Sequence, residues 1–220
     1  MYSGGQSKSN HKLHNAVVDL AKQEKKSRKL QLTYIPFCAD NAHVFYERAI
    51  RRYRSHGIER FFCMPVDGPL TKHEIEVALE SDVIYLAGGN TFYFLKHLRA
   101  SGMLEKLKTF AKKGGVLAGL SAGALIMSPT TKLAADKSLG PDPNDVGIKD
   151  FKGMNLFGFE FSPHFHPTKK QITAHRTYSL KTPNPVFASE DGGGVIINGD
   201  DIRMCGKGMF FYQGTTIHLG

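Results

Sequence analysis

Apolar positions along the chain alternate between helical and strand-like spacing. In residues 11–24 they recur every three or four positions, at Leu13, Val17, Leu20 and Ala21. This spacing predicts an amphipathic helix. The run 30–35, which ends at Pro36, predicts a strand. Little chain precedes the helix, so the opening strand of the fold is expected to be very short or cut at the terminus.

The same alternation continues through the first half of the chain. Helices are predicted at 41–55, from Thr71 onward, at 91–100 and at 103–112, and strands at 58–64, 82–87 and 116–120. Asp40 is a plausible N-cap and Gly57 a stop for the helix 41–55, while Thr71 and Glu74 form a capping-box pattern. Repeated strand–helix units predict one doubly wound, mostly parallel α/β sheet with flanking helices and one core.

The second half of the chain follows a different pattern. Residues 129–150 are rich in Pro, Asp, Lys and Gly, and a loop of this length is usually functional or mobile. A strand at 156–161 and a helix at 168–180 follow, and then short strands at 186–189, 194–197, 202–205 and 209–212. Turns at 198–200 and 213–214 predict antiparallel hairpins at the edge of the sheet.

Length and composition indicate an ordinary globular protein. A chain of 220 residues with 41% hydrophobic and 22% charged residues predicts a single domain spanning 1–220, as a monomer or homodimer. No apolar run approaches membrane-spanning length and the N-terminus lacks signal-peptide regions, so a cytoplasmic location without membrane contact is expected. Three scattered cysteines exclude a disulfide framework and are interpreted as buried small residues.

The formal net charge of +9 allows two interpretations. Basic residues sometimes mark a nucleic-acid partner, but here they are spread over several helix ends and loops without a recognisable reading motif. A solvated basic surface is therefore expected, with no nucleic-acid partner. Such a surface would also favour acidic substrates.

The most informative motif is Gly119-Leu-Ser121-Ala-Gly123, placed between an apolar strand and a helix. This is the nucleophile-elbow pattern, in which small neighbours permit a tight turn that exposes the serine hydroxyl. The alternative is a buried strand that simply turns into a helix. The position favours Ser121 as a nucleophile, because the helix N-terminus offers backbone N–H groups to an oxyanion.

A nucleophilic serine needs a base, and ten histidines are available. Seven of them lie on predicted helices or helix ends, where solvent exposure is the simpler explanation: His11, His14, His43, His56, His73, His97 and His175. His164 and His166 instead follow the end of a predicted strand, and spacing alone does not choose between them. A His-x-His pair also allows a metal site, but no third ligand is evident nearby, so no metal is expected.

Three segments together resemble peptidase E, the α-aspartyl dipeptidase family, which is related to cyanophycinase-like serine peptidases. They are Ala87-Gly-Gly-Asn-Thr-Phe92, Gly119-Leu-Ser-Ala-Gly-Ala124 and Pro163-His164-Phe165. The resemblance implies a class I glutamine amidotransferase-like fold with antiparallel strands at the C-terminal edge. It also implies a serine dipeptidase without a cofactor, acting on short peptides with an N-terminal aspartate.

The resemblance assigns roles to individual residues. Ser121 is the implied nucleophile, His164 the base and Glu190 the carboxylate that orients the base. Asp191 and Asp136 are competing candidates for that carboxylate, and a β-turn role for residues 190–191 is the structural alternative.

Further roles concern the oxyanion and the substrate. The expected oxyanion donors are the backbone N–H groups of Ala122 and of Gly88 or Gly89, although two glycines at this turn also suit tight strand-to-helix packing. Asn90, Lys169, Lys170 and Arg176 are the expected substrate-binding residues. The family's arginine after the histidine segment has no aligned counterpart here, and lysine lacks the bidentate geometry of arginine.

Two other functions remain open at this point. The same scaffold would serve a serine hydrolase or esterase of different specificity, or a catalytically silent binding module, because one fold hosts many functions.

Overall fold

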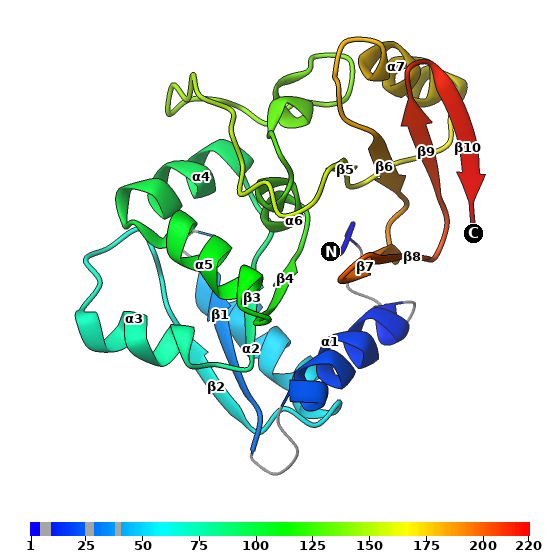
Figure 1. Ribbon diagram of the computed structural model, residues 1–220. Coiled ribbons are helices and arrows are strands. Elements are labelled where there is room, and N and C mark those ends of the chain that lie inside the picture. Colours follow the sequence, from blue (N-terminus) through cyan, green and yellow to red (C-terminus); the bar gives the residue numbers. More distant parts are fainter. Residues whose placement is uncertain (5–9, 25–28, 38–40) are drawn as a thin grey trace.

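A parallel sheet forms the centre of the molecule in the computed structural model, which describes residues 1–4, 10–24, 29–37 and 41–220 (Figure 1). Its strands run in the order β2-β1-β3-β4: β2 is Arg60–Cys63, β1 Gln31–Ile35, β3 Val83–Leu86 and β4 Val116–Gly119. All three pairings are parallel. The predicted doubly wound α/β architecture is thereby confirmed, and the carboxyl ends of the strands share one edge.

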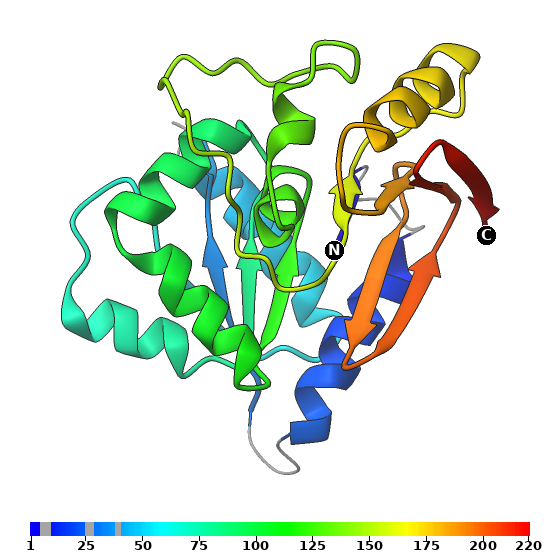
Figure 2. The same ribbon diagram turned by 45° about the horizontal axis from the view of Figure 1, so that its top comes forward.

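Helices cover both faces of this sheet (Figures 1 and 2). On one face, α1 (His11–Glu24) and α2 (Ala42–Arg54) pack against β1, β3 and β4 through a cluster that includes Leu13, Tyr53 and Tyr85. The opposite face is covered by α3 (Lys72–Leu79), α4 (Thr91–Ala100), α5 (Met103–Lys112) and α6 (Ala122–Met127). Helices 91–100 and 103–112 were predicted with these bounds. None of the described helices is both long and apolar enough to cross a bilayer.

The C-terminal half forms two further sheets. One has the order β10-β9-β6-β5, with β5 at Glu160–Ser162, β6 at Val186–Ser189, β9 at Gly208–Tyr212 and β10 at Thr215–Leu219. The other pairs β7 (Gly194–Asn198) with β8 (Asp201–Cys205). Helix α7 (Lys169–Ser179) packs on the larger of the two, and a short 3-10 helix occupies Lys132–Ala135. The two expected antiparallel hairpins are confirmed as β7–β8 and β9–β10.

The expectation of one sheet and one core was wrong, because the described strands form three sheets around three apolar clusters. Tyr2 lies between two of these sheets. Its backbone N–H donates to Gly119 O at 2.7 Å, and its carbonyl accepts from Ser121 N–H at 3.0 Å. Tyr2 thus occupies the free edge of β4 and bridges it to Gly194 of β7. This one-residue bridge is the very short opening strand, and β5 pairs with β6 instead.

The strand predicted at 156–161 is displaced toward the C-terminus, since β5 covers only Glu160–Ser162. The backbone N–H groups before it have other partners. Met154 N–H donates to Ile126 O at 2.7 Å and Leu156 N–H donates to Met127 O at 3.2 Å. This segment therefore satisfies the last carbonyls of α6, which a helix leaves without internal partners.

Some helix ends lie where the capping and stop residues of the sequence predicted them. The capping box of Thr71 and Glu74 is present at the start of α3. Gly57, with φ of 102°, follows the end of α2 as expected of a left-handed stop residue. The predicted N-cap Asp40 lies outside the described residues, and Asn41 occupies the N-cap position of α2 without a side-chain capping bond.

Two histidines interpreted as exposed are buried. His14 and His175 each retain only 2% of their accessible surface. His14 Nδ1 lies 3.0 Å from the Tyr2 hydroxyl, and His175 Nε2 lies 2.8 Å from Ser162 Oγ. Burial, reinforced by the positive charge of Arg52, lowers the pKa of His14 to about 3. Both rings are neutral members of internal networks, which helical spacing alone did not reveal.

The cysteines are less buried than expected. Cys63 and Cys205 are free thiols and only half-buried, while Cys38 lies outside the described residues. Burial nevertheless raises the pKa of Cys63 to about 11, which makes it a poor nucleophile.

Candidate active site

Ser121 occupies the turn between β4 and α6, at the carboxyl end of a central strand. Its backbone has φ of 50° and ψ of −110°, a conformation that L-residues rarely adopt. Such strain persists only where surrounding contacts enforce it, and it is characteristic of a nucleophile elbow. The strand–turn–helix context that the sequence predicted is therefore present.

The two glycines of the motif are required by close packing. A methyl group built on Gly119 would lie 2.6 Å from the backbone carbonyl carbon of Gly123, and one built on Gly123 would lie 2.6 Å from Leu86 O. Both contacts are with backbone atoms, which cannot rotate away. Strand β4, helix α6 and the end of β3 thus approach each other at distances that only glycine permits.

Replacing Gly123 with alanine should therefore destabilise the fold. Overpacking a well-packed site typically costs about 1–3 kcal/mol, and a contact with rigid backbone is at the upper end of that range or beyond it. Denaturant unfolding measures the loss. Gly68→Ala is the matched control, because a methyl group there meets nothing within 4 Å. Equal stability of the two variants would contradict this account of the motif.

His164 contacts the serine directly. Its Nε2 lies 2.9 Å from Ser121 Oγ, and the residue directly follows β5 and Pro163. The choice between the two histidines is thereby resolved in favour of His164 as the neighbour of Ser121. His166 is exposed, and its backbone N–H donates to Gln171 Oε1. Within the described ranges, no group of three or more His, Cys, Asp or Glu side chains is arranged to hold a metal ion.

Asp191, and not Glu190, contacts the imidazole. Asp191 Oδ1 lies 2.8 Å from His164 Nδ1, so the prediction that Glu190 makes this contact was wrong. The backbone explains the difference. Glu190 N–H donates to Lys207 O, in the connection between β8 and β9. The chain then turns, so that the next side chain, the Asp191 carboxylate, faces His164. With Asp191 accepting from Nδ1–H, Nε2 is free to accept the Ser121 hydroxyl proton.

The third candidate, Asp136, lies elsewhere. Its Oδ1 accepts hydrogen bonds from the backbone and side chain of Ser138, two residues along the same loop. Its charge acts on His175, where it partly opposes the burial that lowers the pKa of that ring. Asp136 therefore does not serve His164.

The expected oxyanion donors surround the serine. A methyl group built on Gly88 would lie 3.4 Å from Ser121 Cβ, so the Gly88 backbone is adjacent to the nucleophile. Gly89 has φ of 141° and packs against the Phe37 ring so closely that a side chain would collide with it. Among the described residues, the N–H groups of Gly88, Gly89 and Ala122 have no backbone acceptor. Backbone N–H groups without such an acceptor, at or just before a helix N-terminus, suit an oxyanion.

A cavity of about 300 Å³ opens beside Ser121 and His164. Its walls are mostly apolar, with side chains from the end of β1, from α2 and from the elbow: Tyr34, Pro36, Phe37, Ala42, Phe45, Ala87 and Leu120. Phe45 remains 41% exposed at its edge. The Arg48 guanidinium lies 5.5 Å from the centroid of that ring.

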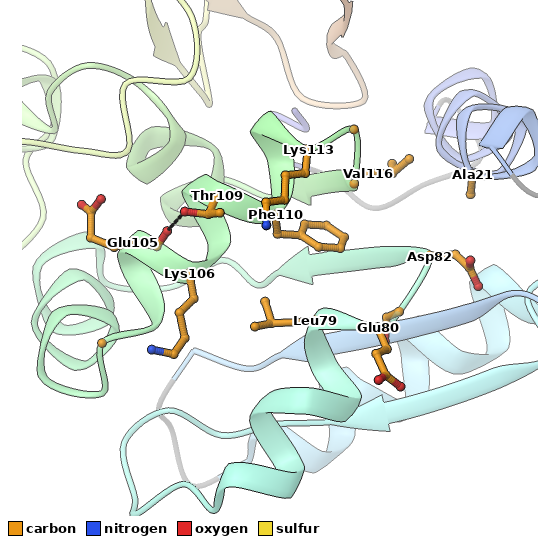
Figure 3. Close-up of a pocket in the computed structure, with 14 residues that line it drawn as sticks. Ala21, Leu79, Glu80, Asp82, Glu105, Lys106, Thr109, Phe110, Lys113 and Val116 are labelled. Atoms are coloured by element: carbon orange, nitrogen blue, oxygen red, sulfur yellow. Dashed lines mark hydrogen bonds between the residues drawn. The ribbon is translucent and has the colours of Figure 1, made fainter.

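A larger cavity of about 550 Å³ lies at the opposite end of the sheet (Figure 3). Its lining includes Val116 at the start of β4, Glu80 and Asp82 before β3, and Lys106 and Phe110 of α5. Ligands of open α/β sheets bind at the carboxyl ends of the strands. The smaller cavity beside Ser121 is therefore the candidate substrate site.

The predicted substrate-binding residues are not gathered there. Asn90 Oδ1 accepts from the backbone N–H groups of Phe92 and Tyr93, and its Nδ2 donates to Pro143 O, so this side chain caps α4 and holds a loop. Lys169, Lys170 and Arg176 are exposed on α7 and do not line the cavity.

The long loop 129–150 is tied down near the site. Asp142 Oδ2 accepts from Thr91 N–H at 2.8 Å, and Asp142 N–H donates to Ala134 O. Asn144 bonds to both the N–H and the carbonyl of Ile148. The bond from Thr91 holds the loop against the N-terminus of α4, and the other bonds stabilise the loop internally.

Two contributors to the site were missed by sequence reasoning. Ser3 and Gly4 lie against His164 and Asp191, although 161 positions separate Ser3 from His164. The sequence offers the small-residue run Ser3-Gly4-Gly5 as a signal, but little chain precedes the first helix, and no role in the site was predicted for it.

Comparison with known proteins identifies the family. The family model for peptidase family S51 matches residues 1–205. An uncharacterized peptidase of Listeria monocytogenes is 26% identical over 145 residues, which are 60% of this chain and 70% of that protein. A peptidase E of Salmonella arizonae is 36% identical over 97 residues, 42% of this chain and 40% of that enzyme. The matched segment thus spans less than half of the Salmonella enzyme.

Solved structures share the fold. A candidate peptidase E protein from Listeria monocytogenes EGD-e superposes with a TM-score of 0.65 at 21% identity, covering 92% of this chain and 95% of that one. A peptidase from an acI-B1 Actinobacterium gives 0.62 at 14% identity, covering 99% and 95%. Because the family model matches nearly the whole chain and a serine elbow stands at the centre of the fold, this protein belongs to peptidase family S51 and is a serine-type peptidase.

Proposed function

We propose that this protein hydrolyses short peptides with Ser121 as nucleophile, His164 as general base and Asp191 as the carboxylate that orients the base. One observation carries the proposal: two consecutive hydrogen bonds join the three side chains, at 2.9 Å and 2.8 Å. A nucleophile, a base within reach of its proton, and a third group holding the base form the arrangement of serine hydrolases.

The roles follow from these contacts. His164 Nε2 removes the hydroxyl proton as Ser121 Oγ attacks the peptide carbonyl carbon. The carbonyl oxygen becomes an oxyanion, which the N–H groups of Ala122 and of Gly88 or Gly89 stabilise. The protonated imidazole then gives its proton to the leaving amine, and an acyl-enzyme remains. Water, deprotonated by the same histidine, cleaves the ester and restores the serine.

For the substrate, we infer a dipeptide with an N-terminal aspartate. The resemblance to peptidase E implies this choice, and the net charge of +9 favours an acidic substrate. Arg48 is a cation close to the cavity, because its guanidinium stacks on Phe45 in the cavity wall. An arginine can bind a carboxylate through two parallel hydrogen bonds.

A second candidate specificity comes from the cavity itself. No lysine or arginine belongs to its lining among the described residues, whereas the rings of Tyr34, Phe37 and Phe45 do. Such walls stabilise an apolar or aromatic side chain through burial. A serine peptidase with apolar specificity is therefore the alternative to the aspartyl dipeptidase.

Hydrolysis of a panel of dipeptides distinguishes the aspartyl specificity from the apolar one. Asp-Leu, Ala-Leu, Leu-Leu and Phe-Leu are compared by amine release with wild-type protein, Arg48→Met and Lys169→Met. Aspartyl specificity predicts that Asp-Leu has the highest kcat/KM and that Arg48→Met lowers this value by about tenfold to a hundredfold, the usual range for a charged hydrogen bond. Lys169→Met should change little. Faster cleavage of Phe-Leu or Leu-Leu, unaffected by Arg48→Met, would reject aspartate and support the apolar candidate.

A further inference from the structure

The N-terminal segment, residues 1–4, touches every member of the proposed triad. It passes between β4 and β7 (Figure 1). Tyr2 forms backbone hydrogen bonds to Gly119 and Ser121, on the two sides of the elbow. Ser3 N–H donates to Gly193 O and Gly4 O accepts from Gly192 N–H, just after Asp191. The segment therefore links the nucleophile turn to the loop that carries the acid.

Ser3 makes the central contacts. Its side-chain oxygen accepts a hydrogen bond from His164 N–H at 2.7 Å. Its single hydroxyl proton is directed to Ser189 O at 2.7 Å, with Asp191 Oδ1 at 3.3 Å as a second acceptor. Ser3 is fully buried, so water does not replace these bonds.

The backbone of His164 explains why this contact matters. His164 has φ of 55°, which is unusual for a residue with a side chain. Strained backbone of this kind persists only when its surroundings hold it. The Ser3 oxygen binds the N–H group of this residue and thereby fixes the direction in which the imidazole leaves the chain.

Gly4 provides the space for the imidazole and the carboxylate. A methyl group built on it would lie 2.3 Å from His164 Cε1 and 2.4 Å from Asp191 Oδ1. The bare α-carbon of Gly4 therefore packs directly over the hydrogen bond between these two side chains. Glycine is required here by space alone, because its φ is not in the left-handed region.

We propose that Ser3 is a positioning residue for hydrolysis. Its hydroxyl holds His164 and Asp191 in the positions from which His164 contacts Ser121, and Gly4 leaves space for the His164 and Asp191 side chains. The inference rests on the proposed function. Ser3 does not touch the substrate, so its effect is on the rate of the chemical step and not on binding. A displacement of about 1 Å at a catalytic group is enough to lower a rate by about a hundredfold.

The test compares Ser3→Ala with Ser179→Ala. Ser179 is equally buried and has the same pattern of bonds, since its Oγ accepts from Gly214 N–H and donates to Arg176 O. We expect Ser3→Ala to lower kcat for the best dipeptide of the panel about tenfold to a hundredfold, with KM changed less than about twofold. Ser179→Ala should lower the midpoint of thermal unfolding about as much as Ser3→Ala does, and it should leave kcat unchanged.

Labelling by a serine-directed phosphonofluoridate is a second measurement that needs no substrate. Ser3→Ala and Gly4→Ala should both react more slowly at Ser121 than wild type, while Gly68→Ala should react at the wild-type rate. Wild-type kcat and labelling in Ser3→Ala, or an equal loss of kcat in Ser179→Ala, would overturn the proposal. If the proposed function itself is wrong, peptide hydrolysis will persist in Ser121→Ala.

Discussion

Replacing Ser121 with alanine is expected to abolish peptide hydrolysis, with a loss of kcat on the order of 10⁴-fold to 10⁶-fold. The range is the one seen when the nucleophile of a serine hydrolase is removed, because only oxyanion stabilisation and binding remain. The strained backbone at this position suits alanine no less than serine, so the fold should persist. Amine release from the dipeptide panel measures the loss, and circular dichroism checks the fold.

Ser162 supplies the control for this experiment. It also lies beside a histidine, with 2.8 Å between its Oγ and His175 Nε2, but it retains only 7% of its accessible surface. A phosphonofluoridate probe should label wild type and Ser162→Ala at Ser121, and it should not label Ser121→Ala. Peptide turnover that survives in Ser121→Ala would reject the nucleophile. Labelling of Ser121 without cleavage of any dipeptide would keep the nucleophile and reject the substrate class.

The second large effect is expected at Asp191. Asp191→Asn should lower kcat on the order of 10²-fold to 10⁴-fold, because an amide neither fixes the required tautomer of His164 nor stabilises the imidazolium that forms. The larger figure, about 10⁴-fold, is the loss of kcat caused by an Asp→Asn replacement in a buried Ser-His-Asp triad. The smaller figure takes account of exposure: the side chains of His164 and Asp191 are 50% and 41% exposed, and water weakens their interaction.

Glu190→Gln is the matched variant, since it makes the same chemical change one residue earlier. It should retain nearly wild-type kcat, because the described contacts of Glu190 are made by its backbone. Steady-state kinetics on both variants decide between the two carboxylates. A large loss in Glu190→Gln with little change in Asp191→Asn would reverse the assignment and restore the prediction made from sequence.

The error at this carboxylate has a physical cause. Residues 191–192 form a turn after β6, closed by a hydrogen bond from Gly193 N–H to Glu190 O, and in a turn neighbouring side chains point in different directions, so a prediction that is off by one residue selects the wrong carboxylate. The resemblance pointed to Glu190 with Asp191 as a competitor, and which of these two carboxylates faces His164 depends on how the backbone is bonded. The acceptor of the Glu190 N–H bond, Lys207 O, lies in the connection between β8 and β9, and its position depends on how these strands pair.

The substrate-binding residues illustrate a second limit. Asn90, Lys169, Lys170 and Arg176 were chosen for their chemistry and their position in the motifs. Asn90 is engaged in capping α4, and the three basic residues lie on exposed positions of α7. Phe37 and Phe45 line the cavity beside Ser121 but belong to no sequence motif. The wall of a cavity forms only when elements distant in the sequence pack together, so a local pattern does not reveal it.

Sequence alone determined the alternation of strands and helices and the strand–turn–helix elbow at Ser121. These features depend on local periodicity, glycine spacing and short motifs, which are all contained within a few consecutive residues. Tertiary structure alone decided that Tyr2 links β4 to β7, that Asp191 faces His164, and that Ser3 and Gly4 pack against both. The contacts of Tyr2, Ser3 and Gly4 join residues more than a hundred positions apart, and those of Asp191 and His164 join residues 27 positions apart, so the distances are fixed only by the packing of the whole chain.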